Sequence, residues 1–307
     1  MTREWTKREI GDLTGKVAIV TGGNSGIGLE TSLALAENYA TVILAVRNLN
    51  KGHEAADKIK KEFPNADVLV LKLDLSDLQS VKEFSEEFRR KFRSLSILIN
   101  NAGVLKPPKS QTKDGYETQF GVNYLGHFAL TGLLLDLIIK TPDSRVVSLG
   151  SISAHNLKAE FKEFTGSKKK SSNTMKKYAQ SKLACMYFAK ELQHRFRARN
   201  IDSKSIACHP GIAQTYIFGK GSHKFKTRLT RASLKVIGQS AEMAAYPILY
   251  AATEYSIRGG EYIGPDGKKG IKGFPTELEI LNEQFVENVS NNLWVLSEKL
   301  TGVTYKF

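Results

Sequence analysis

Cysteine is scarce in this chain of 307 residues, which contains only Cys185 and Cys208. Two cysteines cannot form the disulfide framework of a small secreted protein or a four-cysteine metal site. The six histidines lack the spacing of metal ligands relative to cysteines or carboxylates, so we expect no metal site. This composition fits a reducing, cytoplasmic location.

Long hydrophobic runs are also missing. No window approaches the roughly 18 uninterrupted apolar residues of a membrane-spanning helix, and charges run through the N-terminal stretch MTREWTKREIGDLTGK. We therefore expect neither an export signal nor a spanning anchor. The chain has only 8 prolines, with 41% hydrophobic and 25% charged residues, which excludes disordered and collagen-like classes.

Acidic residues are too few to balance the basic ones: 31 face 45, which gives a net charge of +14. Residues 156–177 hold seven lysines against two glutamates, and residues 219–235 hold six basic residues and no acid. Such segments are either solvated surface or a rim that steers an anionic cofactor or contacts an anionic membrane from the periphery. No helix-turn-helix, zinc-finger or RNP-like motif supports nucleic acid binding.

Short apolar runs alternate with amphipathic stretches, and no shift in composition marks a domain linker. This pattern predicts an α/β fold with a doubly wound, mostly parallel sheet of about seven strands and helices on both faces. The apolar runs predict strands at 17–21, 41–46, 68–72, 97–100, 145–149 and 203–208. The amphipathic stretches predict helices at 28–37, 49–62, 78–92, 115–139, 176–199 and 241–252.

A glycine-rich stretch, TGGNSGIG, runs from Thr21 to Gly28 directly after the first predicted strand. Glycines at such a turn let the backbone approach a pyrophosphate, and the N–H groups at the start of the following helix can bind its charge. Glycine clusters also occur in ordinary strand-to-helix turns. The position between a strand and a helix favours nucleotide binding.

Four further motifs carry polar residues, two of them at the ends of predicted strands and two inside predicted helices. They are NNAG at 100–103, GVNYLGHF around Asn123, YAQSK with Tyr178 and Lys182, and HPGIAQT with Pro210 and Gly211. With the glycine-rich stretch, they resemble in order and wording the short-chain dehydrogenase/reductase family. Within it, GKVAIVTGGNSGIGLET resembles the branch that contains retinol dehydrogenases and the WW-domain oxidoreductase.

The resemblance covers about residues 14–264 and implies a single Rossmann-fold domain over residues 1–307. Residues 265–307 are then a C-terminal extension. Residues 156–177 and 212–240 correspond to the family's substrate-side segments and are long here.

Tyr178 and Lys182 are four residues apart in a predicted helix, so their side chains share one face. An ammonium near a phenol favours the phenolate, which suits a tyrosine to acid–base catalysis. An isolated pair of this kind is more often a solvated helix face. The resemblance assigns Tyr178 as the proton donor or acceptor, and Lys182 as the residue that tunes it and holds the nicotinamide ribose.

The third catalytic residue should be a serine in RVVSLGSIS, at the end of the fifth strand. The family usually has two adjacent serines there, and that register assigns Ser151. Ser153 is the next candidate, and capping of a helix or loop is the alternative for both. Asn123 completes the set by resemblance, which implies a kinked helix and a water that relays protons. Asparagine is intrinsically unfavourable inside a helix, which fits a local distortion.

The cofactor choice should be decided at the end of the second strand, where Arg47 offers a guanidinium to a 2′-phosphate. We therefore expect NADP(H), with an exposed strand-end arginine as the alternative. Asp74 matches the family's adenine-contacting aspartate, or is a helix N-cap. The complete predicted cofactor set is Gly22, Asn24, Ser25, Gly26, Ile27, Gly28, Arg47, Asn48, Asp74, Leu75, Asn101, Ala102, Gly103, Tyr178, Lys182, Pro210, Gly211 and Ile212.

These roles imply an oxidoreductase that interconverts a carbonyl and an alcohol by hydride transfer. The alternative is a non-catalytic module that senses NADPH, although a candidate stands at every catalytic position. Apolar residues in the two long segments suggest a hydrophobic aldehyde or ketone: Leu157, Phe161, Phe164, Ile212, Tyr216, Ile217 and Phe218. His155, just after the candidate serine, could line the pocket, and Cys185 is expected to be a small buried hydrophobe.

The resemblance also implies a homodimer or homotetramer formed through the helix of Tyr178 and the helix before it. Five apolar residues on these helices could form the contact: Phe128, Leu133, Met186, Tyr187 and Phe188. The same residues could equally belong to the core.

Overall fold

A computed structural model of the chain describes residues 4–155, 157–159, 161, 173–212, 238–279 and 286–307. Eight strands form one sheet in the order β3-β2-β1-β4-β5-β6-β7-β8. All neighbours are parallel except the antiparallel pair β7 and β8. The strands are β1 (Val17–Thr21), β2 (Thr41–Val46), β3 (Val68–Lys72), β4 (Ile97–Asn100), β5 (Arg145–Leu149), β6 (Lys204–Cys208), β7 (Tyr262–Pro265) and β8 (Pro275–Glu277).

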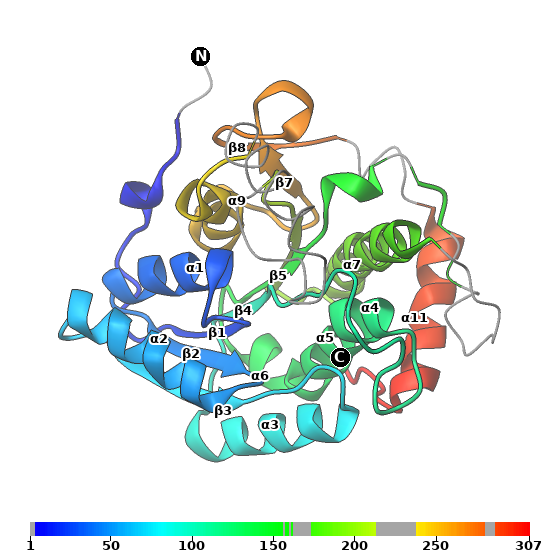
Figure 1. The fold of residues 1–307 in the computed structure, drawn as a ribbon, viewed down its shortest axis with the longest axis horizontal. Coiled ribbons are helices and arrows are strands. Elements are labelled where there is room, and N and C mark those ends of the chain that lie inside the picture. Colours follow the sequence, from blue (N-terminus) through cyan, green and yellow to red (C-terminus); the bar gives the residue numbers. More distant parts are fainter. Residues whose placement is uncertain (1–3, 156, 160, 162–172, 213–237, 280–285) are drawn as a thin grey trace.

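Helices cover both faces of the sheet (Figure 1). One face carries α1 (Gly26–Glu37), α2 (Leu49–Glu62) and α9 (Ala241–Thr253). The other carries α3 (Leu78–Lys91), α5 (Gly126–Leu133) and α7 (Thr174–Arg197). Successive strand residues point to opposite faces of the sheet. Ile19 packs in the core under α3, α5 and α7, and Ala18 and Val20 pack in the core under α1, α2 and α9. The doubly wound parallel sheet predicted from sequence is therefore confirmed.

Shorter helical pieces complete the described chain. They are η1 (Lys7–Glu9), α4 (Thr118–Phe120), the π-helical turn η2 (Gly121–Leu125), α6 (Leu135–Lys140), η3 (Ile152–Ala154) and η5 (Lys268–Gly270), and the long helix α11 (Glu287–Thr301) follows them near the C-terminus. In the ranges that the structure describes, no helix combines the length and the apolar character needed to cross a membrane.

The prediction of one continuous helix over residues 115–139 was wrong. Gly115 has a φ of +85°, so helix begins only at Thr118, where the Glu117 side chain accepts a hydrogen bond from the Phe120 N–H. The chain then widens into η2 and breaks again at Leu134, which lies between α5 and α6. Apolar periodicity survives such breaks, because each piece still buries the same face.

The C-terminal helix α11 packs on α5 and α7, along the outer side of α7 in Figure 1. Trp294 is 2% exposed, and its ring lies 5.2 Å from that of Phe128 and 5.9 Å from that of Phe188. Met186 and Tyr187 are buried as well. The apolar residues that were expected either to contact a second subunit or to belong to the core therefore lie in the core. The C-terminal helix α11 covers the helices α5 and α7 that carry them.

We expect Trp294→Ala to lower the free energy of unfolding by about 3–5 kcal/mol, because it opens a cavity among packed aromatic rings. Val295→Ala is the matched control: the next residue on the same helix is 57% exposed, so its loss should be within about 0.5 kcal/mol. Urea unfolding of both variants measures this. Equal losses would show that α11 does not close the core.

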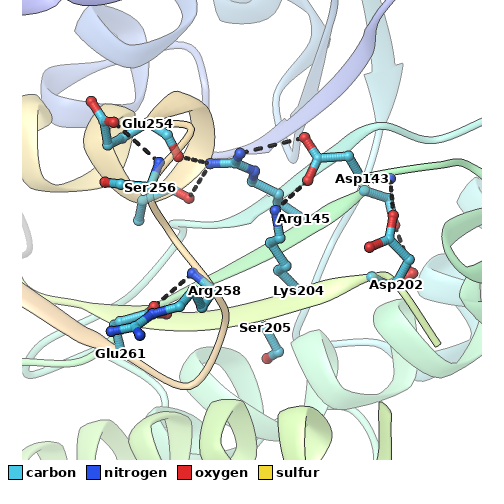
Figure 2. Close-up of polar contacts among 12 residues, drawn as sticks. Asp143, Arg145, Asp202, Lys204, Ser205, Glu254, Ser256, Arg258 and Glu261 are labelled. Carbon is cyan, nitrogen blue, oxygen red and sulfur yellow. Dashed lines mark hydrogen bonds and ion pairs between the residues drawn. The ribbon is translucent and has the colours of Figure 1, made fainter. Parts of the chain in front are cut away.

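A buried arginine organises the amino-terminal edge of the sheet (Figure 2). Arg145 is 4% exposed, and its guanidinium donates to the Glu254 carbonyl oxygen at 2.7 Å, directly after α9. Its other side faces the Asp143 carboxylate at 3.4 Å, which also pairs with Lys204 at 2.5 Å. The Arg145 cation donates a hydrogen bond to a carbonyl oxygen at the carboxyl end of α9 and so connects this helix to β5 and β6.

Candidate active site

The glycine-rich loop joins β1 to α1. Gly22 and Gly26 have φ angles of +66° and +55°, the left-handed region that favours glycine. A Cβ on Gly28 would lie 2.5 Å from the Gly22 carbonyl oxygen, so only glycine permits this close approach. Ser25 stands at the N-cap of α1 and makes no capping bond with its own side chain. This cradle and the helix N-terminus fit the pyrophosphate of a dinucleotide.

Thr21, at the end of β1, fixes the loop to the end of β4. Its hydroxyl accepts hydrogen bonds from the N–H groups of Asn101 and Ala102, both at 2.9 Å. The Asn101 side chain donates to the Thr21 carbonyl oxygen at 2.7 Å. The strand order reverses between β1 and β4, and ligands of doubly wound sheets bind at such a reversal.

Lys182 and Asn123 meet beside Gly103. The Lys182 ammonium donates to the Leu149 carbonyl oxygen, at the end of β5, at 2.9 Å. A Cβ on Gly103 would lie 3.3 Å from Asn123 Oδ1 and 3.5 Å from Lys182 Nζ. Tyr178 lies one turn earlier on the same face of α7 and is 8% exposed. Residues from four distant stretches of sequence thus converge at the carboxyl edge of the sheet.

Asn123 lies in the π-helical turn η2, which confirms the predicted local distortion. Its Oδ1 accepts from the Val104 N–H at 2.7 Å. Its Nδ2 donates to the Val104 carbonyl oxygen at 3.1 Å and to Ser181 Oγ at 2.9 Å. The Asn123 carbonyl oxygen, in the widened turn, accepts from the Cys185 thiol at 3.1 Å. Cys185 is buried, as predicted.

Sequence reasoning missed His127, which connects Asn123 to the glycine-rich loop. Its Nδ1 lies 2.9 Å from the Asn123 carbonyl oxygen, and since a carbonyl only accepts, Nδ1 donates. Its Nε2 therefore accepts from the Thr21 hydroxyl at 2.9 Å. Burial lowers the pKa of His127 to about 3, which keeps this neutral form. The available signal was its position four residues after Asn123.

This burial predicts acid sensitivity. An unfolded histidine titrates near about 6.5, so between about pH 6.5 and the lowered folded pKa the unfolded state binds more protons and stability falls as pH falls. The contribution of His127 is up to about 1.4 kcal/mol per pH unit. Urea unfolding at about pH 7 and about pH 5 should show a smaller fall for His127→Gln than for the unaltered chain. Exposed His53 is the control, because His53→Gln should keep the full fall. Equal falls in both variants would contradict this assignment.

Ser151 is half-buried at the start of the turn η3, where its Oγ accepts from the Ser153 N–H at 3.2 Å and from Ser153 Oγ at 3.0 Å. The capping alternative is therefore confirmed for Ser151, and its catalytic role stays a prediction. Gly150 occupies the place of the family's other serine. A Cβ there would lie 2.8 Å from Met186 Cγ, which explains the small residue.

Arg47 is exposed directly after β2. The neighbouring Asn48 is the N-cap of α2, and its side chain accepts from the Lys51 N–H at 3.1 Å. Asp74 Oδ1 accepts from the Ser76 N–H and hydroxyl, at 3.0 and 2.7 Å. Asp77 caps α3, so the alternative in which Asp74 is the helix N-cap was wrong.

The turn after β6 is held by backbone bonds. Gly211 has a φ of +64°, and a Cβ on it would overlap the Ile271 carbonyl oxygen. The Ile212 N–H donates to that same oxygen at 2.9 Å, and the Gln239 side chain donates to the Pro210 carbonyl oxygen at 2.9 Å. Pro210, Gly211 and Ile212 thus border the same edge as Thr21 and Leu149.

Most of the two basic segments lies outside the described residues, and so do four predicted substrate-facing residues: Phe164, Tyr216, Ile217 and Phe218. Of the others, Leu157 is half-buried. Phe161 is 7% exposed, and its ring centroid lies 5.7 Å from that of Tyr187.

Three comparisons place this geometry among known proteins. A profile of the family described as short chain dehydrogenase matches residues 16–173. Retinol dehydrogenase 13 of Mus musculus is 36% identical over 95% of this chain and 85% of its own length. Retinol dehydrogenase 11 of Mus musculus is 44% identical over 81% of this chain and 78% of its own. A crystal structure of a Mycobacterium paratuberculosis protein aligns with a TM-score of 0.79 at 31% identity, covering 99% of this chain and all of the other.

Proposed function

The chain belongs to the short chain dehydrogenase family of oxidoreductases, and we propose that it interconverts a hydrophobic aldehyde or ketone and the corresponding alcohol with NADP(H). The observation that carries this proposal is the convergence of Lys182, Asn123 and Gly103 beside the glycine-rich loop. Tyr178 lies one helical turn from Lys182.

The bound cofactor would supply or accept the hydride at its nicotinamide ring. In the reductive direction Tyr178 donates a proton to the carbonyl oxygen, and in the oxidative direction it removes one from the alcohol. Ser151 orients and polarises that oxygen. Lys182 lies one helical turn from Tyr178 and would hold the nicotinamide ribose, and Asn123 supports proton transfer to Lys182.

The glycine-rich loop and the N-terminus of α1 would hold the pyrophosphate. Arg47 is exposed after β2, next in the sheet to β1, where an adenosine ribose would lie. A guanidinium there can bind a 2′-phosphate with two charge-assisted hydrogen bonds. This supports NADP(H) over NAD(H).

A hydrophobic substrate is supported by two observations. Relatives at 36% and 44% identity are named retinol dehydrogenases, and retinol is an apolar alcohol. The two long substrate-side segments also carry several aromatic and aliphatic residues.

A panel of aldehydes and ketones tests the proposal, offered with NADPH and with NADH in parallel while cofactor absorbance is followed. Retinal and shorter apolar aldehydes should be reduced with NADPH, and small polar carbonyls should react more slowly. A preference for NADH would overturn the cofactor assignment. No turnover with any carbonyl or alcohol would overturn the proposed function.

A further inference from the structure

Three buried polar rings gather next to the candidate site without a role in it: His155, His209 and Tyr262. They are 9%, 0% and 1% exposed. The centroids of the two histidine rings lie 5.0 Å apart, and that of Tyr262 lies 5.5 Å from His155 and 5.4 Å from His209. We call these residues the ring cluster.

Hydrogen bonds fix the ring cluster. His155 Nε2 lies 2.8 Å from the Tyr262 hydroxyl. His209 Nδ1 accepts from the Gly211 N–H at 3.2 Å. Burial lowers the pKa of both histidines and raises that of Tyr262, so all three stay neutral around pH 7.

Packing also fixes the His209 ring. A Cβ on Gly264 would overlap it, and one on Gly270 would lie 3.1 Å from its Cε1. His209 Nε2 has no hydrogen-bond partner among the described residues. Burying a polar nitrogen without a hydrogen-bond partner costs free energy, so the position of this ring calls for an explanation in the elements that it joins.

The ring cluster joins two turns that border the candidate site. His155 directly follows the turn η3, and Ser151, its N-cap, directly precedes it. His209 directly precedes the turn of Pro210 and Gly211. Tyr262 begins β7, which pairs with β6. The His155–Tyr262 bond therefore ties the serine-bearing turn to the sheet beside the turn at Gly211.

We propose that His155 and Tyr262 are positioning residues: their hydrogen bond holds the Ser151 turn in register with the Gly211 turn. This inference rests on the proposed function, because it gives Ser151 the task of orienting the substrate oxygen. A shift of a positioned group by about 1 Å can cost up to about 100-fold in rate, so one distant bond can matter to turnover.

Tyr262→Phe removes the hydroxyl and keeps the ring. We expect kcat to fall about 10-fold, because the altered turn carries Ser151, which orients the substrate oxygen. The Kd for NADPH should stay within about 2-fold, because the glycine-rich loop is unchanged. In a Ser151→Ala background the same change should lower kcat less than 2-fold further, since the group that it positions is already gone. Multiplying effects in the double variant, or an unchanged kcat in Tyr262→Phe, would overturn the proposal.

Tyr305→Phe is the matched control. It also deletes one buried hydroxyl, which donates to the Phe128 carbonyl oxygen at 2.7 Å, away from Ser151. It should destabilise the chain comparably and leave kcat within about 2-fold. A similar loss of kcat in both variants would show general loosening and overturn the positioning role.

Hydrogen exchange gives a readout that needs no substrate. The amides of residues 152–155 should exchange faster in Tyr262→Phe and not in Tyr305→Phe. Unchanged exchange in Tyr262→Phe would overturn the inference even with the proposed function intact. If exchange were faster in Tyr262→Phe but the unaltered chain reduced no carbonyl, the His155–Tyr262 bond would still hold the two turns together. Its role in catalysis would then be overturned together with the proposed function.

Discussion

Tyr178→Phe should lower kcat for carbonyl reduction by about 100- to 10,000-fold, the usual contribution of one positioned acid–base group. The ring stays and only the hydroxyl is lost, so the packing of this 8%-exposed side chain is preserved. The Kd for NADPH should stay within about 3-fold, because the glycine-rich loop and the N-terminus of α1 are untouched. Steady-state kinetics and cofactor titration measure the two effects separately.

Tyr187→Phe is the control for Tyr178→Phe. Tyr187 lies on the same helix and is 3% exposed, but it belongs to the hydrophobic core. It should keep kcat within about 2-fold. If Tyr178→Phe were as active as the unaltered chain, Tyr178 would not be the acid–base residue. If the unaltered chain bound NADPH but turned over no carbonyl or alcohol, a module that senses NADPH would become the better account.

Arg47→Asp should reverse the cofactor preference. The change removes the cation proposed for the 2′-phosphate and puts an anion there, which can accept hydrogen bonds from the free ribose hydroxyls of NADH. A lost charge-assisted hydrogen bond is worth about 1.5–3 kcal/mol, so kcat/KM with NADPH should fall at least about 10- to 100-fold. With NADH it should rise or hold.

Arg93→Asp makes the same change of charge elsewhere. Arg93 is exposed before β4, at the opposite edge of the sheet, so the ratio of the two cofactors should stay within about 2-fold. Parallel kinetics with NADPH and NADH give the ratio for both variants. An unchanged ratio in Arg47→Asp would contradict the assignment of Arg47.

Six of the eight strands, β1 to β6, could be predicted closely because both faces of the sheet are covered, whereas the short strands β7 and β8 were not predicted. In β1 and β2 every residue but Thr41 is buried, so the apolar run itself marks the strand. The helix around Asn123 could not be predicted in detail. The asparagine indicated a distortion, but the Asn123 carbonyl oxygen in that turn also accepts a hydrogen bond from Cys185, which is 62 positions away in sequence.

The same limit applies to the site. Motifs pointed to Lys182 and Asn123, and the structure brings both to Gly103. They did not point to the bond between His127 and Thr21 or to the one between Tyr262 and His155, which join residues 106 and 107 positions apart. Apolar spacing likewise could not tell whether Phe128 and Phe188 face a partner or the chain's own Trp294.

Transfer of isotope from cofactor to product tests the central claim most directly. The chain is supplied with NADPH that carries deuterium at both positions of the hydride-donating carbon, together with an apolar aldehyde, and the product is analysed by mass spectrometry. The account predicts an alcohol with one deuterium on the former carbonyl carbon, formed by the unaltered chain and at the background level by Tyr178→Phe. An unlabelled alcohol, or equal labelling with the variant, would contradict it.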